Sequence, residues 1–66
     1  MKISIKGARV EKNMTQSQVG KEMGVTKDTI SNWERGKTAP TGNQLLKLCE
    51  LYNVSPSDIF LPEKLA

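Results

Sequence analysis

Two short helices separated by only three residues constrain the fold of this chain more than any other feature. The sequence predicts one helix at about 16–23 and a second at about 27–35. The first helix begins at a capping box formed by Thr15 and Gln18 and ends at Gly24. The second begins after the cap residue Thr26 and ends at Gly36. Because the connection is so short, the two helices must cross at a steep angle.

Three further helices are predicted around this pair. Thr41 and Gln44 form a second capping box, and the apolar stripe Leu45, Leu48, Cys49 and Tyr52 follows at helical spacing. Ser55 and Pro56 open a short last helix. The residues at 2–6 alternate as in a strand, but no partner strand is evident, so we expect a first helix capped by Ser4. The expected class is all-α, with five short helices.

Length and composition limit the possibilities further. The chain has 66 residues, which suits a single domain over 1–66. With no histidine and only Cys49, it can form neither an internal disulfide nor a structural zinc site, and we expect no metal or cofactor. The longest apolar run is three residues, 59–61, so we expect no membrane span and a cytoplasmic protein.

The charge is distributed unevenly along the chain. Residues 1–37 carry eight Lys or Arg and four Asp or Glu, whereas residues 38–66 carry two and three. Such a basic first half is compatible with a polyanion bound on one side. An ordinary solvated surface would give the same pattern, so charge alone leaves both interpretations open.

The segment TQSQVGKEMGVTKDTISNWERG, residues 15–36, resembles the helix-turn-helix of phage repressor and Cro proteins, the Xre type. The resemblance extends over about 3–61, the core of the domain, and includes Arg9, Pro40 and the stretch at 52–55. One departure is Gly20, where the family usually has alanine. The resemblance implies a module that binds double-stranded DNA, with the helix at 27–35 in the major groove.

The outward face of that helix carries side chains suited to base edges. With Ile30 turned inward, a rotation of about 100° per residue turns the polar side chains outward or to the flanks. In helix-turn-helix proteins the first turn of this helix meets the bases. The candidate readers are Lys27, Asp28, Thr29, Ser31 and Asn32. Asp28 could instead simply favour the positive end of the helix.

Other polar residues are candidates for the DNA backbone. The family uses the residue matching Gln16 on a phosphate, and helix amino ends attract anions. Beyond the second helix, the candidates for phosphate contacts are Arg35, Lys37, Thr38 and Thr41, although Thr41 could serve only as a cap. We assign Lys6, Lys12, Lys21 and Lys64 to the solvated surface.

Arg9 and Glu34 lean toward apolar faces, and a buried charge without a partner is very costly. We therefore expect them to form a structural ion pair, and the resemblance implies the same pair. The apolar residues after 58 have a different expected use. Ile59 and Phe60 should cover the core, and Leu61 and Leu65 remain for a two-fold partner, which predicts a homodimer on a palindromic operator.

The leading functional hypothesis is a sequence-specific transcriptional regulator, with repression as the expected mode. The alternative is an antitoxin or anti-repressor that acts mainly by binding another protein. An enzyme is not expected, because the sequence lacks histidine, a glycine-rich phosphate loop and a serine with a base in reach. No feature indicates a small-molecule ligand.

Overall fold

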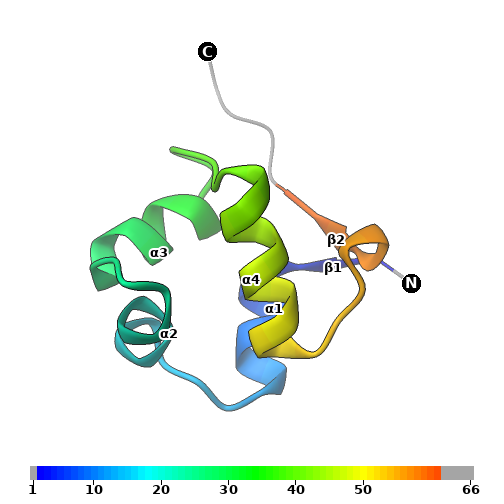
Figure 1. Ribbon diagram of the computed structural model, residues 1–66, viewed down its shortest axis with the longest axis horizontal. Helices are drawn as coiled ribbons and strands as arrows, with labels where there is room; N and C mark the ends of the chain where they lie inside the picture. Colours follow the sequence, from blue (N-terminus) through cyan, green and yellow to red (C-terminus); the bar gives the residue numbers. More distant parts are fainter. Residues whose placement is uncertain (1, 62–66) are drawn as a thin grey trace.

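The computed structural model describes residues 2–61, which form four α-helices, one single-turn 3-10 helix and two short strands (Figure 1). In chain order the elements are β1 (Ile3–Ser4), α1 (Ile5–Glu11), α2 (Gln16–Met23), α3 (Lys27–Glu34), α4 (Gly42–Tyr52), η1 (Pro56–Asp58) and β2 (Ile59–Phe60). In Figure 1, α2 and α3 lie on one side of α4, and the strands lie on the other. The predicted all-α class is confirmed, with a small sheet added.

The helices begin and end where local chemistry dictates. Each starts after a Ser or Thr whose hydroxyl accepts the backbone amide three residues on: Ser4, Thr15, Thr26 and Thr41. After α2, α3 and α4 the chain turns through a left-handed residue: Gly24, Gly36 and Asn53. The helices predicted at 16–23 and 27–35 are therefore present at 16–23 and 27–34.

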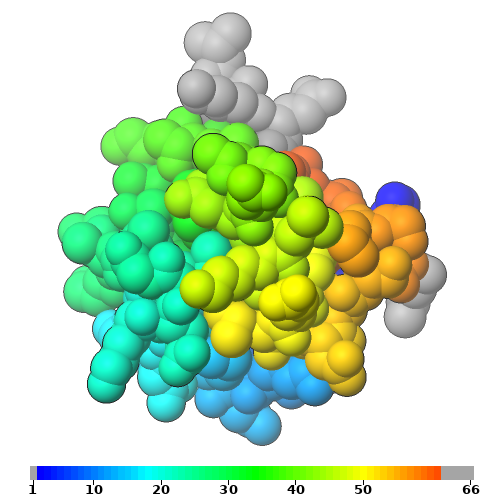
Figure 2. Space-filling model, viewed as in Figure 1, coloured from blue at the N-terminus to red at the C-terminus, as the bar shows by residue number. Residues whose placement is uncertain are grey.

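The core lies where the four helices meet. Its centre is α4, which buries Leu48, Cys49 and Tyr52 on one stripe. The other buried apolar side chains come from α1, α2, α3 and β2: Ile5, Ala8, Val19, Ile30, Trp33 and Ile59. Figure 2 shows the opposite, outer face of α4 in yellow-green, flanked by α2. Within residues 2–61, none of the helices has both the length and the apolar character needed to cross a bilayer.

The prediction of five helices is wrong at the C-terminal end. The expected last helix is one 3-10 turn, η1, followed by β2, which pairs in parallel with β1. Ile3 lies opposite Ile59 and Ser4 opposite Phe60, and the Lys2 ammonium donates to the Ser57 carbonyl at 2.6 Å. The alternation at 2–6 was therefore a partial strand signal after all. Its partner lies far along the sequence, so no local pattern revealed it.

The strand also corrects the expected role of Phe60. Ile59 is buried as predicted, but successive strand residues face opposite sides, so Phe60 turns outward and is 49% exposed. Leu61 follows it and is 36% exposed. Leu65 and Lys64 lie outside the described residues.

Gly20 sets the closest approach between α2 and the turn that leads into α3. The Gly20 carbonyl accepts the Val25 amide at 2.9 Å, which closes the end of α2. A Cβ atom on Gly20 would lie 2.7 Å from the Val25 carbonyl oxygen and 3.2 Å from the Thr26 carbonyl carbon. Both neighbours are backbone atoms that cannot rotate away. Glycine at this position therefore allows the tight packing that fixes the start of α3.

This packing predicts that Gly20→Ala destabilises the protein. Overpacking costs about 1–3 kcal/mol and alanine favours a helix over glycine by ~1 kcal/mol. The net effect should lower the free energy of unfolding by up to about 2 kcal/mol. Chemical denaturation measures the change. Gly42→Ala is the control: nothing lies within 4 Å of a Cβ there, so it should stabilise by roughly 0.4–1 kcal/mol. Equal stabilisation by both variants would contradict the close approach.

Candidate nucleic-acid interface

The Glu34 carboxylate joins three helices at the base of the candidate interface. Arg9 on α1 donates to both of its oxygens, from Nε at 2.7 Å and from Nη2 at 3.2 Å. Gln16, the first residue of α2, donates its side-chain amide to Glu34 Oε1 at 3.0 Å. The Arg9 and Glu34 side chains are only 12% and 3% exposed. The structure therefore brings the predicted pair together and adds Gln16 to it.

The two charges of this network balance each other, because the Arg9 guanidinium is paired with the Glu34 carboxylate. The hydrogen bond to Glu34 raises the pKa of Arg9, so the guanidinium stays charged. Its remaining Nη1 group donates to the Met14 carbonyl at 2.9 Å and holds the connection between α1 and α2. Burial, followed by the nearby Glu34 carboxylate, raises the pKa of Tyr52 to about 12, so this phenol is neutral at physiological pH. The arrangement is a structural clamp.

The first turn of α3 is open to solvent. The Lys27 and Asp28 side chains are 66% and 85% exposed, and their charged atoms lie 3.8 Å apart. Thr29 is half-buried, and its hydroxyl lies 3.1 Å from that of the cap residue Thr26. Thr29 therefore has a local partner that the sequence analysis did not anticipate.

One turn further along α3, Ser31 and Asn32 are half-buried on the flank of the exposed face. Arg35 Nη2 donates to the side-chain oxygen of Asn32 at 2.9 Å. Because the Asn32 oxygen is turned toward Arg35, this hydrogen bond also sets the direction of the Asn32 NH₂ group. Sequence reasoning missed the bond, although the spacing of three residues between Asn32 and Arg35 is a usual one for helical side-chain pairs.

The candidate phosphate contacts after α3 lie on an exposed turn. Arg35, Lys37 and Thr38 are all exposed, and the Lys37 amide donates to the Asn32 carbonyl at 2.9 Å. Thr41 is also exposed and is the amino-terminal cap of α4, where its hydroxyl accepts the Gln44 amide at 3.2 Å. Of the two roles left open for Thr41, the cap is present in the structure.

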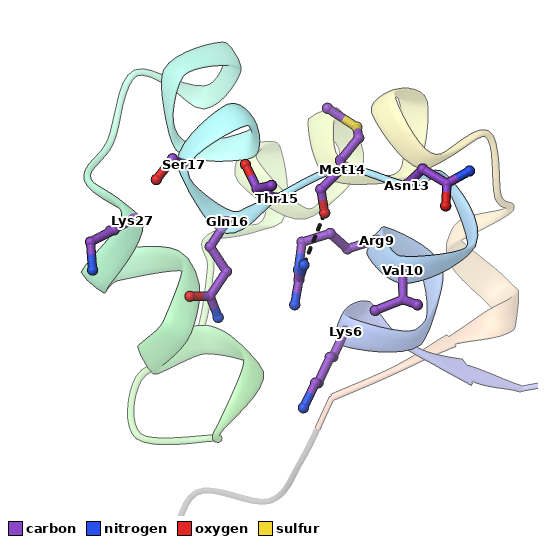
Figure 3. A pocket seen from close by; sticks show the side chains of 9 residues that line it. All are labelled: Lys6, Arg9, Val10, Asn13, Met14, Thr15, Gln16, Ser17 and Lys27. Atoms are coloured by element: carbon purple, nitrogen blue, oxygen red, sulfur yellow. Dashed lines mark hydrogen bonds between the residues drawn. The ribbon is translucent and has the colours of Figure 1, made fainter.

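An open depression of about 660 Å³ lies between α1 and the beginning of α2 (Figure 3). Arg9 and Gln16 lie side by side in it, with Lys27 beyond Gln16 and Lys6 at its opening. The remaining lining residues are Val10, Asn13, Met14, Thr15 and Ser17. None of the nine is acidic, and the amino end of α2 adds partial positive charge. The depression is therefore suited to an anion.

Within residues 2–61, no group of three or more His, Cys, Asp or Glu side chains is placed to hold a metal ion. The one cysteine, Cys49, lies in the core, and burial raises the pKa of its thiol.

A family model described as helix-turn-helix matches residues 5–59. The chain belongs to the Xre-type helix-turn-helix family. An uncharacterized HTH-type transcriptional regulator of Archaeoglobus fulgidus is 36% identical over 61 residues, covering 92% of this chain and 86% of the relative. Another of Methanocaldococcus jannaschii is 35% identical over 63 residues, covering 96% of both.

The family also contains longer relatives. Repressor protein C2 of Salmonella phage P22 is 38% identical over 52 residues, which are 79% of this chain and 24% of that protein. No solved structure matches the chain. The relatives are named as transcriptional regulators or a repressor, which are non-enzymatic roles.

The clamp of this helix-turn-helix protein predicts a strong, non-additive response to mutation. Arg9→Ala and Glu34→Ala should each lower the free energy of unfolding by about 3–5 kcal/mol, because each leaves a buried charge unpaired. The double variant should cost clearly less than the sum of the two. Chemical denaturation at low temperature gives the three values.

The other ion pair serves as the control. Lys27 and Asp28 are exposed, so Lys27→Ala should change the free energy of unfolding by less than about 1 kcal/mol. Strictly additive losses at Arg9 and Glu34 would show that the two side chains do not act as a pair.

Proposed function

We propose that this protein is a sequence-specific transcriptional regulator that binds double-stranded DNA and reads the major groove with α3. The proposal rests on the arrangement of α3 in a chain that belongs to a family of helix-turn-helix regulators. Its outer face is polar and exposed at Lys27 and Asp28, while Glu34 at its other end is fixed to α1 and α2. A reading helix needs both properties, because base recognition requires exposed polar groups on a rigid support.

The base-reading roles follow from the chemistry of each side chain. Lys27 donates to guanine O6 or N7, and Asn32 forms paired bonds with adenine N6 and N7. The contact from Arg35 to the Asn32 oxygen fixes the orientation of that amide. Asp28 accepts from cytosine N4, while Thr29 and Ser31 are secondary readers on the flanks.

Phosphate contacts on both sides of α3 set its depth and direction in the groove. Gln16 donates one amide hydrogen to Glu34 and has a second for a phosphate at the amino end of α2. On the far side, the exposed groups that reach the backbone are Arg35, Lys37, Thr38 and Thr41. These contacts give affinity and register without sequence information.

Repression is the regulatory mode that we assign. The phage P22 relative is named a repressor, and a small protein seated in the major groove of a promoter blocks access to it without further machinery. This role places the protein in the cytoplasm, where bacterial, archaeal and phage DNA is found.

We further propose that the protein binds a palindromic operator as a homodimer through its C-terminal segment. Phe60 at the end of β2 is 49% exposed and Leu61, just beyond it, is 36% exposed, so each side chain offers apolar surface to a two-fold partner. Phe60, which we had assigned to the core, thereby joins Leu61 in the interface, and Leu65 remains a candidate outside the described residues. Two copies related by a two-fold axis match two half-sites about one helical turn apart.

Asn32→Ala tests the reading face. On the best-bound duplex it should cost roughly 1–3 kcal/mol and relax the preference at one base pair. Lys37→Ala, the matched control, should weaken all duplexes to a similar extent because it contacts only the backbone. Each variant is titrated against a panel of single-base changes. A uniform loss for Asn32→Ala across the panel would assign that residue to the backbone and overturn the proposed reading face.

The dimer is tested by sedimentation of the free protein and of its complex with a two-half-site duplex. We expect two protein chains to load together on the duplex, and Phe60→Ser should make complexes with one chain appear at intermediate protein concentrations while leaving the melting temperature nearly unchanged, because Phe60 is outside the core. Independent loading of the two half-sites by the unaltered protein, or a single chain at saturation, would contradict the dimer.

A further inference from the structure

The depression beside α2 extends onto α1, and this part of the surface has no role in the reading mechanism above. A second open depression, lined by Ser4, Gly7 and Glu11 among others, shares Lys6, Val10 and Asn13 with the first. The two depressions adjoin at these three residues, and we refer to them together as the α1 groove. Figure 3 shows Lys6 and Val10 directed from α1 toward the same opening as Gln16.

Val10 is unusual on this surface. It is 56% exposed, the largest exposed fraction among the big apolar residues of 2–61. Its neighbours along the groove are polar or charged, so the side chain does not belong to a broad apolar patch. Val10 thus offers one apolar contact next to the ammonium group of Lys6.

Charge supports the same occupant. Lys6 and Lys27 flank the depression, while the charge of Arg9 is largely compensated by Glu34. Glu11 is the one acidic residue that lines the groove, and it lies at the far end, in the second depression. The side nearest to Gln16 and the amino end of α2 is therefore positive, and this positive side continues onto α1 at Lys6.

We infer that the DNA footprint extends over α1, where Lys6 binds a backbone phosphate and Val10 packs against the adjoining deoxyribose. This inference rests on the proposed DNA-binding function and adds contacts that the sequence did not indicate, since Lys6 had been assigned to the solvated surface. Lys6 and Val10 are four residues apart on one helix, so both side chains face the same strand.

The test is the salt dependence of binding to the best-bound duplex, measured for the unaltered protein and for charge-matched variants. Lys6→Gln should weaken binding and lower the slope of log affinity against log salt by about 0.9, one phosphate contact. Lys47→Gln, which removes the same charge from the exposed face of α4, should leave the slope unchanged. Val10→Ala should weaken binding by about threefold with no change of slope, because it removes only apolar contact.

The outcomes separate this inference from the proposed function. If the unaltered protein binds DNA with a normal salt slope, but Lys6→Gln and Lys47→Gln have equal slopes, the footprint on α1 is wrong and the reading by α3 stands. If the unaltered protein does not bind duplex DNA even at low salt, the proposed function fails. Thermal melting of each variant tests whether unfolding is the cause of weaker binding. Because both side chains are exposed, we expect unchanged melting temperatures.

Discussion

The arrangement of the other helices depends on the hydrogen bonds that the Glu34 carboxylate accepts. It is 3% exposed and bonded to Arg9 from α1 and to Gln16 from α2, while it stands at the end of α3. Breaking one side of such a pair costs about 3–5 kcal/mol. At roughly 0.05–0.15 kcal/mol per residue, a domain of 66 residues has about 3–10 kcal/mol of stability in total. The loss of one partner of the clamp would therefore remove a large part of the stability of the fold.

The clamp also connects stability to function. Glu34 holds one end of the helix whose other end, at Lys27 and Asp28, is presented to solvent. Gln16, which completes the clamp, is the residue at the amino end of α2 where we place a phosphate. Gly20 fixes the turn between the two helices by letting the Val25 carbonyl approach. These contacts of Arg9, Gln16 and Gly20 together set the position of α3.

Much of the fold was predictable because it is encoded locally. Thr15, Thr26 and Thr41 cap helices, and Gly24, Gly36 and Asn53 end them, within a few residues of the groups they satisfy. The strand pair was missed because Ile3 and Ile59 are distant in sequence, and Phe60 was misplaced as a consequence.

The candidate site divides in the same way. The partnership of Arg9 with Glu34 was predictable, because two charges on apolar faces need one another. The bonds from Gln16 to Glu34 and from Arg35 to Asn32 were not, because polar side chains on a helix have several partners within reach. The position of Lys6 at the opening of a groove depends on how α1 packs beside α2, which no local pattern reveals.

The central claim is that α3 reads DNA sequence as part of a two-fold assembly. Selection of bound oligonucleotides from a random pool of duplexes tests it most directly, because it assumes no operator. We expect one enriched palindrome, with two half-sites whose centres lie about 10 base pairs or a multiple of that apart. Binding that is retained without any enriched sequence would contradict reading by α3, and an enriched single half-site would contradict the two-fold assembly.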